Sequence, residues 1–120
     1  MLNKITLTGR LTADPESRYS SNGKAICTFT LAVDRPFKNA NGEKETDFIR
    51  HIAFGKMAES LAQNLYKGRL VATSGRLQVR TYENQEGKKR SIAEVVAKQV
   101  VYLDWPKKEE EIGLPDDTPF

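Results

Sequence analysis

One strand-like run, residues 70–82, alternates polar and apolar side chains near its end. Arg76, Arg80 and Tyr82 share one face of this run, whereas Leu77 and Val79 point the other way, toward a core. Flat bases stack on aromatic rings and phosphates attract arginines, so such a face suits single-stranded nucleic acid. This pattern makes the run a candidate binding surface for an extended polyanion.

A second run, residues 46–54, combines rings and a cation in the same way. Phe48, Arg50 and Phe54 share one face, and Ile49 and His51 share the other. Because both faces carry apolar residues, alternation leaves open whether Phe48 and Phe54 belong to the core or to an exposed surface.

Phe37 lies just after a third strand-like run, residues 25–35. Phe37 lies at an even number of residues from the core candidates between residues 29 and 33, so in a continuous strand it would share their face and be buried. Pro36, however, has no backbone N–H and is expected to end the strand. Since Arg35 and Lys38 flank the ring in a turn-rich loop, we expect Phe37 to be exposed.

Residues suited to catalysis or metal binding are sparse in this chain. His51 is the only histidine, so a zinc cluster or a Ser–His–Asp set would have to depend on it. No glycine-rich phosphate loop is present, and Asp14 and Glu16 lie beside Arg18 in a predicted turn. We therefore expect no enzymatic activity, no metal and no cofactor. The single cysteine, Cys27, cannot form an internal disulfide and favours a reducing, cytoplasmic setting.

The elements that must position these residues are mostly strands. Period-two alternation covers residues 5–11, 25–35, 46–54, 70–82 and 90–103, while residues 12–24 are predicted to be irregular, with a turn at Asn22 and Gly23. Only residues 57–65 show helical spacing, and Gly68 is well placed to end that helix. Five strands with one helix between the third and fourth predict a mainly β, five-stranded OB-fold barrel.

Composition and charge change at residue 104. Residues 1–103 carry 17 Lys and Arg against 10 Asp and Glu, whereas residues 104–120 carry two lysines against six carboxylates. The net charge of +3 therefore combines a basic body at +7 with an acidic tail at −4. We expect an OB-fold domain over residues 1–103 that binds a polyanion, and a disordered, flexible acidic tail over residues 104–120 that meets another partner. The chain has no apolar run long enough to predict a membrane span.

Six segments occur in the order and approximate spacing of a known protein family. They read NKITLTGRLTADPESRY, NGK, FTLAV, HIAFGKMAE, YKGRLVATSGRL and EVVA. Through them the chain resembles the bacterial single-stranded DNA-binding proteins, usually called SSB, over residues 1 to about 103 and again at the C-terminal tip. The resemblance implies an OB-fold that assembles as a homotetramer and wraps single-stranded DNA without strong sequence preference.

The resemblance also implies which residues contact DNA. The four ring positions that stack bases in the family fall on Phe37, Phe48, Phe54 and Tyr82, which implies that all four are exposed. Tryptophan is common at three of these positions in the family, so the rings here are smaller. Positions that direct cations toward the DNA backbone in the family fall on Arg50, Lys56, Lys67 and Arg80. Facing and proximity add four further phosphate-contact candidates, which are Arg10, Arg35, Lys38 and Arg76.

The last six residues, PDDTPF, resemble the family's partner-docking peptide. A disordered tip can insert Phe120 into a pocket of a partner, with Pro119 beside it, while Asp116 and Asp117 meet a basic rim. The resemblance implies partners among the enzymes of replication, recombination and repair. The segment between the domain and the tip is shorter than the linker common in the family.

These inferences favour a non-enzymatic protein that binds and protects single-stranded DNA in the cytoplasm, associated with the nucleoid. Two other binding functions stay open. One is an OB-fold binder of single-stranded RNA, since nothing in the sequence reads a 2′-hydroxyl. The other is an adaptor whose basic body docks an acidic protein, and a metal-dependent enzyme acting on the bound strand is a third alternative.

Overall fold

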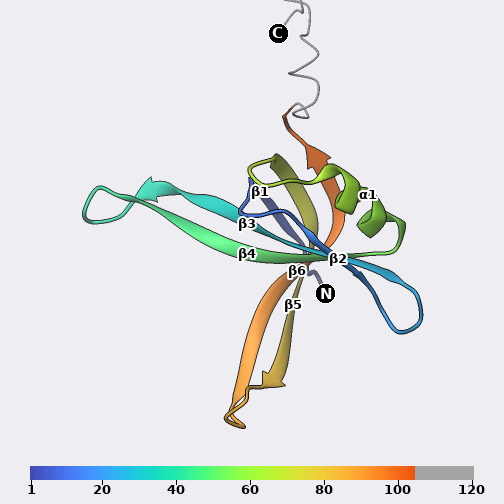
Figure 1. Ribbon diagram of the computed structural model, residues 1–120. Helices are drawn as coiled ribbons and strands as arrows, with labels where there is room; N and C mark the ends of the chain where they lie inside the picture. The colour runs from blue at the N-terminus through green and yellow to red at the C-terminus, as the bar shows by residue number, and fades with distance from the viewer. Residues whose placement is uncertain (105–120) are drawn as a thin grey trace, which may run out of the picture.

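The computed structural model describes residues 1–104, which form a closed β-barrel with one helix (Figure 1). The strands are β1 (Ile5–Leu11), β2 (Glu16–Tyr19), β3 (Ala25–Lys38), β4 (Lys44–Phe54), β5 (Leu70–Glu83) and β6 (Lys89–Tyr102), and α1 (Lys56–Asn64) lies between β4 and β5. The predictions for the tail, including those for Asp116, Asp117, Pro119 and Phe120, lie outside the described residues.

Five strands close the barrel in the order β1-β5-β6-β4-β3, because β1 pairs with both β5 and β3. Each neighbouring pair is antiparallel except β4 and β6, which run parallel. The predicted mainly β, five-stranded OB-fold barrel is thereby confirmed, with its helix between the third and fourth predicted strands, now β4 and β5.

The core lies inside the barrel and extends under α1. Cys27, Phe29 and Leu31 of β3 are buried there, as their alternation predicts, and Leu61 of α1 packs against the same cluster. The helix ends earlier than Gly68, since Leu65 already has an extended backbone. Gly68 belongs instead to the turn that leads into β5.

A short strand, β2, lies in the segment that was predicted to be irregular, and this corrects the prediction. Its four residues pair antiparallel with the first four residues of β3, from Ala25 to Thr28. All four are exposed, so no apolar alternation marks them in the sequence. Backbone hydrogen bonds to the edge of β3 form β2, and side-chain periodicity does not report such bonds. The predicted turn is present, with a backbone hydrogen bond of 2.9 Å from Gly23 to Ser20.

The hairpin of β3 and β4 extends beyond the barrel as an arm (Figure 1). Here β3 continues through Pro36 to Lys38, although the proline was predicted to end the strand. The register of β3 against β4 shifts between Asp34 and Lys38, and such irregularities are where strands tolerate proline. Pro36 therefore interrupts the backbone pairing of β3 with β4 without ending β3.

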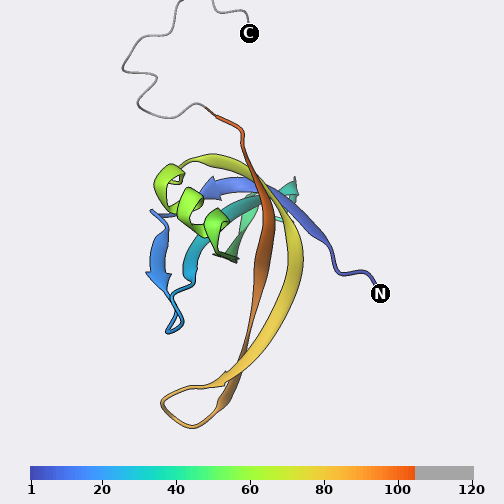
Figure 2. The same ribbon diagram turned by 90° about the vertical axis from the view of Figure 1, so that its right-hand side faces the viewer.

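The hairpin of β5 and β6 forms a second arm, which runs downward from the barrel in the view of Figure 2, with its tip far from α1. Leu77 and Val79 lie on this arm and are exposed. The prediction that these two residues face a core is therefore wrong, because β5 has already left the barrel at their positions. Nothing within residues 1–104 covers them.

The last described residue, Asp104, is attached to the end of the barrel. Its Oδ2 accepts the backbone N–H of Leu70 at 3.0 Å, and its Oδ1 lies 3.4 Å from Nε of Arg69. The Arg69 guanidinium also lies 4.1 Å from the ring centroid of Tyr102. The predicted division into a domain over residues 1–103 and a tail over 104–120 stays a prediction. Within residues 1–104, no helix has the length and apolar character to cross a membrane.

His51 is a fully buried member of the barrel interior. Its ring stacks on Phe29, with 4.9 Å between the ring centroids. Its Nδ1 lies 3.0 Å from the carbonyl oxygen of Ile49, which can only accept, so Nδ1 carries the proton and Nε2 accepts from Thr73 Oγ1 at 2.9 Å. Burial lowers the pKa of His51, partly offset by the hydrogen bond to Ile49.

We expect the free energy of unfolding to decrease as the pH falls below the ordinary histidine pKa of about 6.5. The unfolded chain binds a proton on His51 at a pH where the folded chain does not, so acid favours unfolding by at most about 1.4 kcal/mol per pH unit. Urea unfolding at several values between pH 7.5 and 5 measures this slope. In His51→Gln the slope in this window should be shallower, and an unchanged slope would assign it to other groups.

Candidate nucleic-acid interface

Strand register places one set of alternate residues on the outside of the barrel, opposite to the core. Cross-strand partners share a face, and Thr30 pairs with Arg50, Ala32 with Phe48, and Ile52 with Val96. The same register continues from β6 onto β5. We call this side of the sheet the outer face; it comprises Ile26, Thr28, Thr30, Ala32, Phe48, Arg50, Ile52, Phe54, Arg76, Gln78, Arg80, Tyr82, Arg90, Ile92, Glu94 and Val96. Within it, Ile26, Ile52 and Val96 form a small buried apolar cluster, and Thr28 and Glu94 are also buried.

All four rings predicted to stack bases are exposed. The exposed fractions are 65% for Phe37, 69% for Phe48, 38% for Phe54 and 47% for Tyr82. Phe48 and Phe54 lie on the outer face of β4, Tyr82 lies on the β5–β6 arm, and Phe37 lies on the β3–β4 arm. The exposure implied by the resemblance is confirmed, and the alternative that placed Phe48 and Phe54 in the core is wrong. Base stacking by these rings stays a prediction.

Three of the predicted phosphate-contacting cations, Arg50, Arg76 and Arg80, lie on the outer face. Two of them share one buried anion, because Nε of Arg50 donates to Glu94 Oε2 at 3.1 Å and Nε of Arg80 donates to Glu94 Oε1 at 2.9 Å. Gln78 adds a third hydrogen bond to the same carboxylate at 3.3 Å. Burial alone raises the pKa of Glu94, but the hydrogen bonds from Arg80 and Arg50 outweigh burial and lower it.

Two other predicted cations are already paired with protein groups. Arg35 donates through Nε and Nη2 to the two carboxylate oxygens of Asp47, at 3.1 and 3.0 Å, and also contacts Glu45. Arg10 Nη1 donates to the carbonyl of Gly68 at 3.0 Å and lies 3.6 Å from Asp104. Arg35 engages all three of its guanidinium nitrogens and Arg10 engages a terminal one, whereas Arg50 and Arg80 are held through Nε alone. A phosphate would have to compete for those terminal donors, so Arg10 and Arg35 are weaker candidates than Arg50 and Arg80.

The three predicted lysines lie apart from one another. Lys38 ends β3 on its arm, Lys56 opens α1 two residues after Phe54, and Lys67 lies in the loop after α1. None of them forms an ion pair within residues 1–104. Their roles toward phosphate stay predictions, and Lys56 is the one adjacent to a ring of the outer face.

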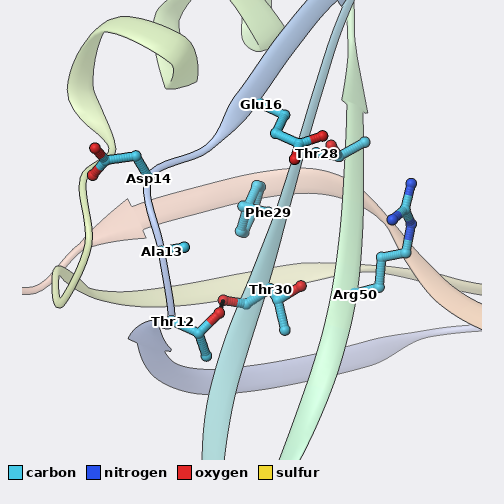
Figure 3. A pocket seen from close by; sticks show the side chains of 8 residues that line it. All are labelled: Thr12, Ala13, Asp14, Glu16, Thr28, Phe29, Thr30 and Arg50. Carbon is cyan, nitrogen blue, oxygen red and sulfur yellow. Dashed lines mark hydrogen bonds between the residues drawn. The ribbon is translucent and has the colours of Figure 1, made fainter.

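A pocket of about 120 Å³ lies beside Arg50, between the segment joining β1 to β2 and strand β3 (Figure 3). Thr28 and Thr30 line it from β3, and Glu16, which pairs with Thr28, closes one side. Figure 3 shows Arg50 on the opposite side of β3 from Asp14. The pocket adds hydroxyl groups to the edge of the outer face next to a cation.

Glu94 is a component of this surface that the sequence pattern did not single out. It stands between Ala93 and Val95 in a run of mostly apolar residues, and it is only 1% exposed as a side chain. A charged residue at a position with the spacing of buried ones is the signal that could have identified it. Within residues 1–104, no group of three or more His, Cys, Asp or Glu side chains is placed to hold a metal ion.

Comparison with known proteins gives one family and closely similar relatives. The single-strand binding protein family matches residues 2–103. Single-stranded DNA-binding protein A of Bacillus subtilis is 51% identical over 104 residues, which is 87% of this chain and 60% of that protein. The single-stranded DNA-binding protein of Halalkalibacterium halodurans is 50% identical over 104 residues, or 87% of this chain and 62% of that protein. Single-stranded DNA-binding protein 2 of Clostridium acetobutylicum is 50% identical over 107 residues, or 88% of this chain and 80% of that protein.

The chain therefore spans about 60% of the length of the first two of these relatives. The names of all three describe DNA-binding proteins, and none of them names a reaction.

Lys24 is a further residue near the interface that the sequence did not indicate, since its Nζ lies 5.3 Å from the ring centroid of Phe54.

Proposed function

The chain belongs to the single-strand binding protein family, and from that premise we propose that it binds single-stranded DNA on its outer face without strong sequence preference. In this role it covers and protects DNA strands exposed during replication, recombination and repair. We place it in the cytoplasm with the nucleoid, and we propose no catalytic step.

The observation that supports this function best is the combination of exposed rings and arginines on one continuous surface. Phe48 and Arg50 lie two residues apart on the same face of β4, and Arg80 and Tyr82 lie two residues apart on the same face of β5. Stacking on rings is available to every base because every base has a π-face, whereas phosphates contact the cations regardless of sequence. Such a surface suits an unpaired strand better than a duplex, whose bases are already stacked on one another.

Anisotropy titrations of labelled oligo-dT and of a matched duplex, each at low and high salt, test the function. We expect tight binding to oligo-dT that weakens with salt, and little binding to the duplex. Equal affinity for oligo-dT and for the duplex would mean that the basic body binds polyanions in general and does not select single strands. An oligo-U arm tests the RNA alternative, and binding of an acidic protein but of no oligonucleotide would support the adaptor.

We further propose that copies of this chain associate, with a homotetramer as the assembled state. Support comes from Leu77 and Val79, which are exposed on the side of the β5–β6 arm opposite to the outer face. Sedimentation should give about four times the chain mass of 13.5 kDa. A single species at the chain mass would contradict the tetramer.

The C-terminal tip is proposed to recruit replication, recombination and repair proteins, and also to compete weakly with DNA for the basic body. Deleting residues 112–120 removes the carboxylates of Asp116 and Asp117. Exposed charge pairs contribute about 0.2–1 kcal/mol each, so the deletion should tighten oligo-dT binding at low salt by roughly twofold to thirtyfold. Asp116→Asn with Asp117→Asn should reproduce most of that gain, and the gain should vanish at high salt. Unchanged affinity of the deleted chain at low salt would refute the competition.

A further inference from the structure

A buried carboxylate lies beneath the centre of the outer face. Glu94 belongs to β6, which pairs with β4 on one side and β5 on the other. It receives hydrogen bonds from Arg50 on β4 and from Arg80 and Gln78 on β5. An anion is unfavourable next to a path for phosphates, so its presence at this position requires a physical reason.

The atoms that Glu94 engages suggest the reason. Both arginines donate through Nε, the nitrogen nearest to the side-chain stem, and each uses a different carboxylate oxygen. The terminal nitrogens of both guanidinium groups make no hydrogen bond within residues 1–104, and both side chains are partly exposed. Because the guanidinium is a rigid planar fork, fixing Nε fixes the directions of the terminal donors as well.

The two arginines also lie next to the two rings of the central strands. Arg50 follows Phe48 by two residues on β4, and Arg80 precedes Tyr82 by two residues on β5. A carboxylate that holds both arginines therefore fixes two cations, each two residues from a ring, across three strands.

We propose that Glu94 is a positioning residue, which holds Arg50 and Arg80 with their terminal nitrogens directed outward for phosphates. This inference rests on the proposed function, because it assigns the arginines to a bound strand. Ordering a long side chain on binding costs the equivalent of roughly twofold to tenfold in affinity, and the buried carboxylate removes much of that cost for two arginines.

The effect of Glu94→Gln on oligo-dT affinity distinguishes a positioning role of Glu94 from simple repulsion of phosphates. If Glu94 only repelled phosphates, removing its charge would tighten oligo-dT binding. If it positions the arginines, the amide loses one acceptor and binding should weaken by roughly fivefold to fiftyfold. Glu86→Gln is the matched control, because Glu86 is an exposed residue in the turn of the same arm and undergoes the same change of charge. The control should bind oligo-dT as the unaltered chain does or slightly more tightly.

A double-mutant cycle separates positioning from a general loss of structure. In a chain that already carries Arg50→Ala and Arg80→Ala, Glu94→Gln should leave the affinity unchanged or tighten it, because no arginine is left to position and a negative charge is removed. A structural defect would cost affinity in both backgrounds. Urea unfolding of each variant accompanies the titrations.

Arginine Nε–H signals in ¹⁵N–¹H NMR spectra of the unaltered full-length chain provide a second readout, which does not depend on whether Glu94→Gln folds. Signals from Arg50 and Arg80 should be sharp and slow to exchange, and those from Arg76, which has no carboxylate partner within residues 1–104, should be broad. Equally rapid exchange of all three would overturn the proposal. So would equal or tighter oligo-dT binding by folded Glu94→Gln. Failure of the unaltered chain to bind oligo-dT would instead overturn the proposed function.

Discussion

Replacing Phe48 and Tyr82 together by alanine is expected to weaken oligo-dT binding by roughly 30-fold to 25,000-fold, because each base–aromatic stack contributes about 1–3 kcal/mol. Proteins that bind single strands are among those from which this general range comes. The two rings lie on different strands, β4 and β5, with β6 between them. They should therefore contact different bases, and their losses should be close to additive. The salt dependence of binding should change little, since no cation is removed.

Tyr19→Ala is the matched control for this double replacement. The Tyr19 side chain is as exposed as that of Phe48, at 66% against 69%. Tyr19 pairs with Ala25, a core residue, so its ring lies on the other side of the sheet, near α1. Its removal should leave oligo-dT affinity unchanged within about twofold, an amount below the smallest stacking energy. Equal losses from Tyr19→Ala and from Phe48→Ala would show that exposed rings act without regard to the outer face.

Gly75→Ala is expected to lower the free energy of unfolding by about 3 kcal/mol, at the upper end of the cost of overpacking. A Cβ atom at residue 75 would lie 2.0 Å from the carbonyl oxygen of Val96 and 3.1 Å from Cα of Ala97. These are backbone atoms of the neighbouring strand, so β5 and β6 would have to separate. The site coincides with the shift in register after Ser74, where β5 turns out of the barrel into its arm.

Urea unfolding followed by circular dichroism measures this loss, with all chains compared at one protein concentration in case they associate. Gly42→Ala is the control, because Gly42 has φ of +77° and no heavy atom within 4 Å of its added Cβ. It should cost only the strain of a left-handed residue, about 1–2 kcal/mol. If Gly75→Ala cost no more than the control, the close approach of the two strands at Gly75 would be wrong.

Alternation and helical spacing were sufficient to predict the barrel. Phe29 and Leu31 alternate with Thr28 and Thr30 and are buried inside the barrel with Cys27, because a strand with one face in a core tends to alternate. The single change of period, around Leu61, located the helix. The order of these elements was then enough to predict the OB-fold layout.

Features that depend on contacts between distant segments could not be read in this way. Strand β2 exists because its backbone pairs with β3, and its own side chains are all exposed. Leu77 and Val79 alternate like core residues, yet they lie on an arm beyond the barrel. Local pattern reports which residues share a face, but not whether anything covers that face.

The candidate site shows the same division. Parity placed Phe48, Arg50 and Phe54 on one face but could not say whether that face was buried, and only the resemblance implied exposure. The hydrogen bonds that join Arg50 and Arg80 to Glu94 bring together residues 14 and 44 positions apart in sequence. No spacing rule within one strand predicts such a contact.

The most direct test of the account is photocrosslinking of the full chain to an oligonucleotide that carries 5-iododeoxyuridine, followed by mass spectrometry of the crosslinked peptides. If the bound DNA follows the outer face, crosslinks should occur at Phe48, Phe54 and Tyr82, and also at Phe37 on the neighbouring arm. Crosslinks concentrated instead at Tyr19, an exposed ring on the other side of the sheet, would contradict it.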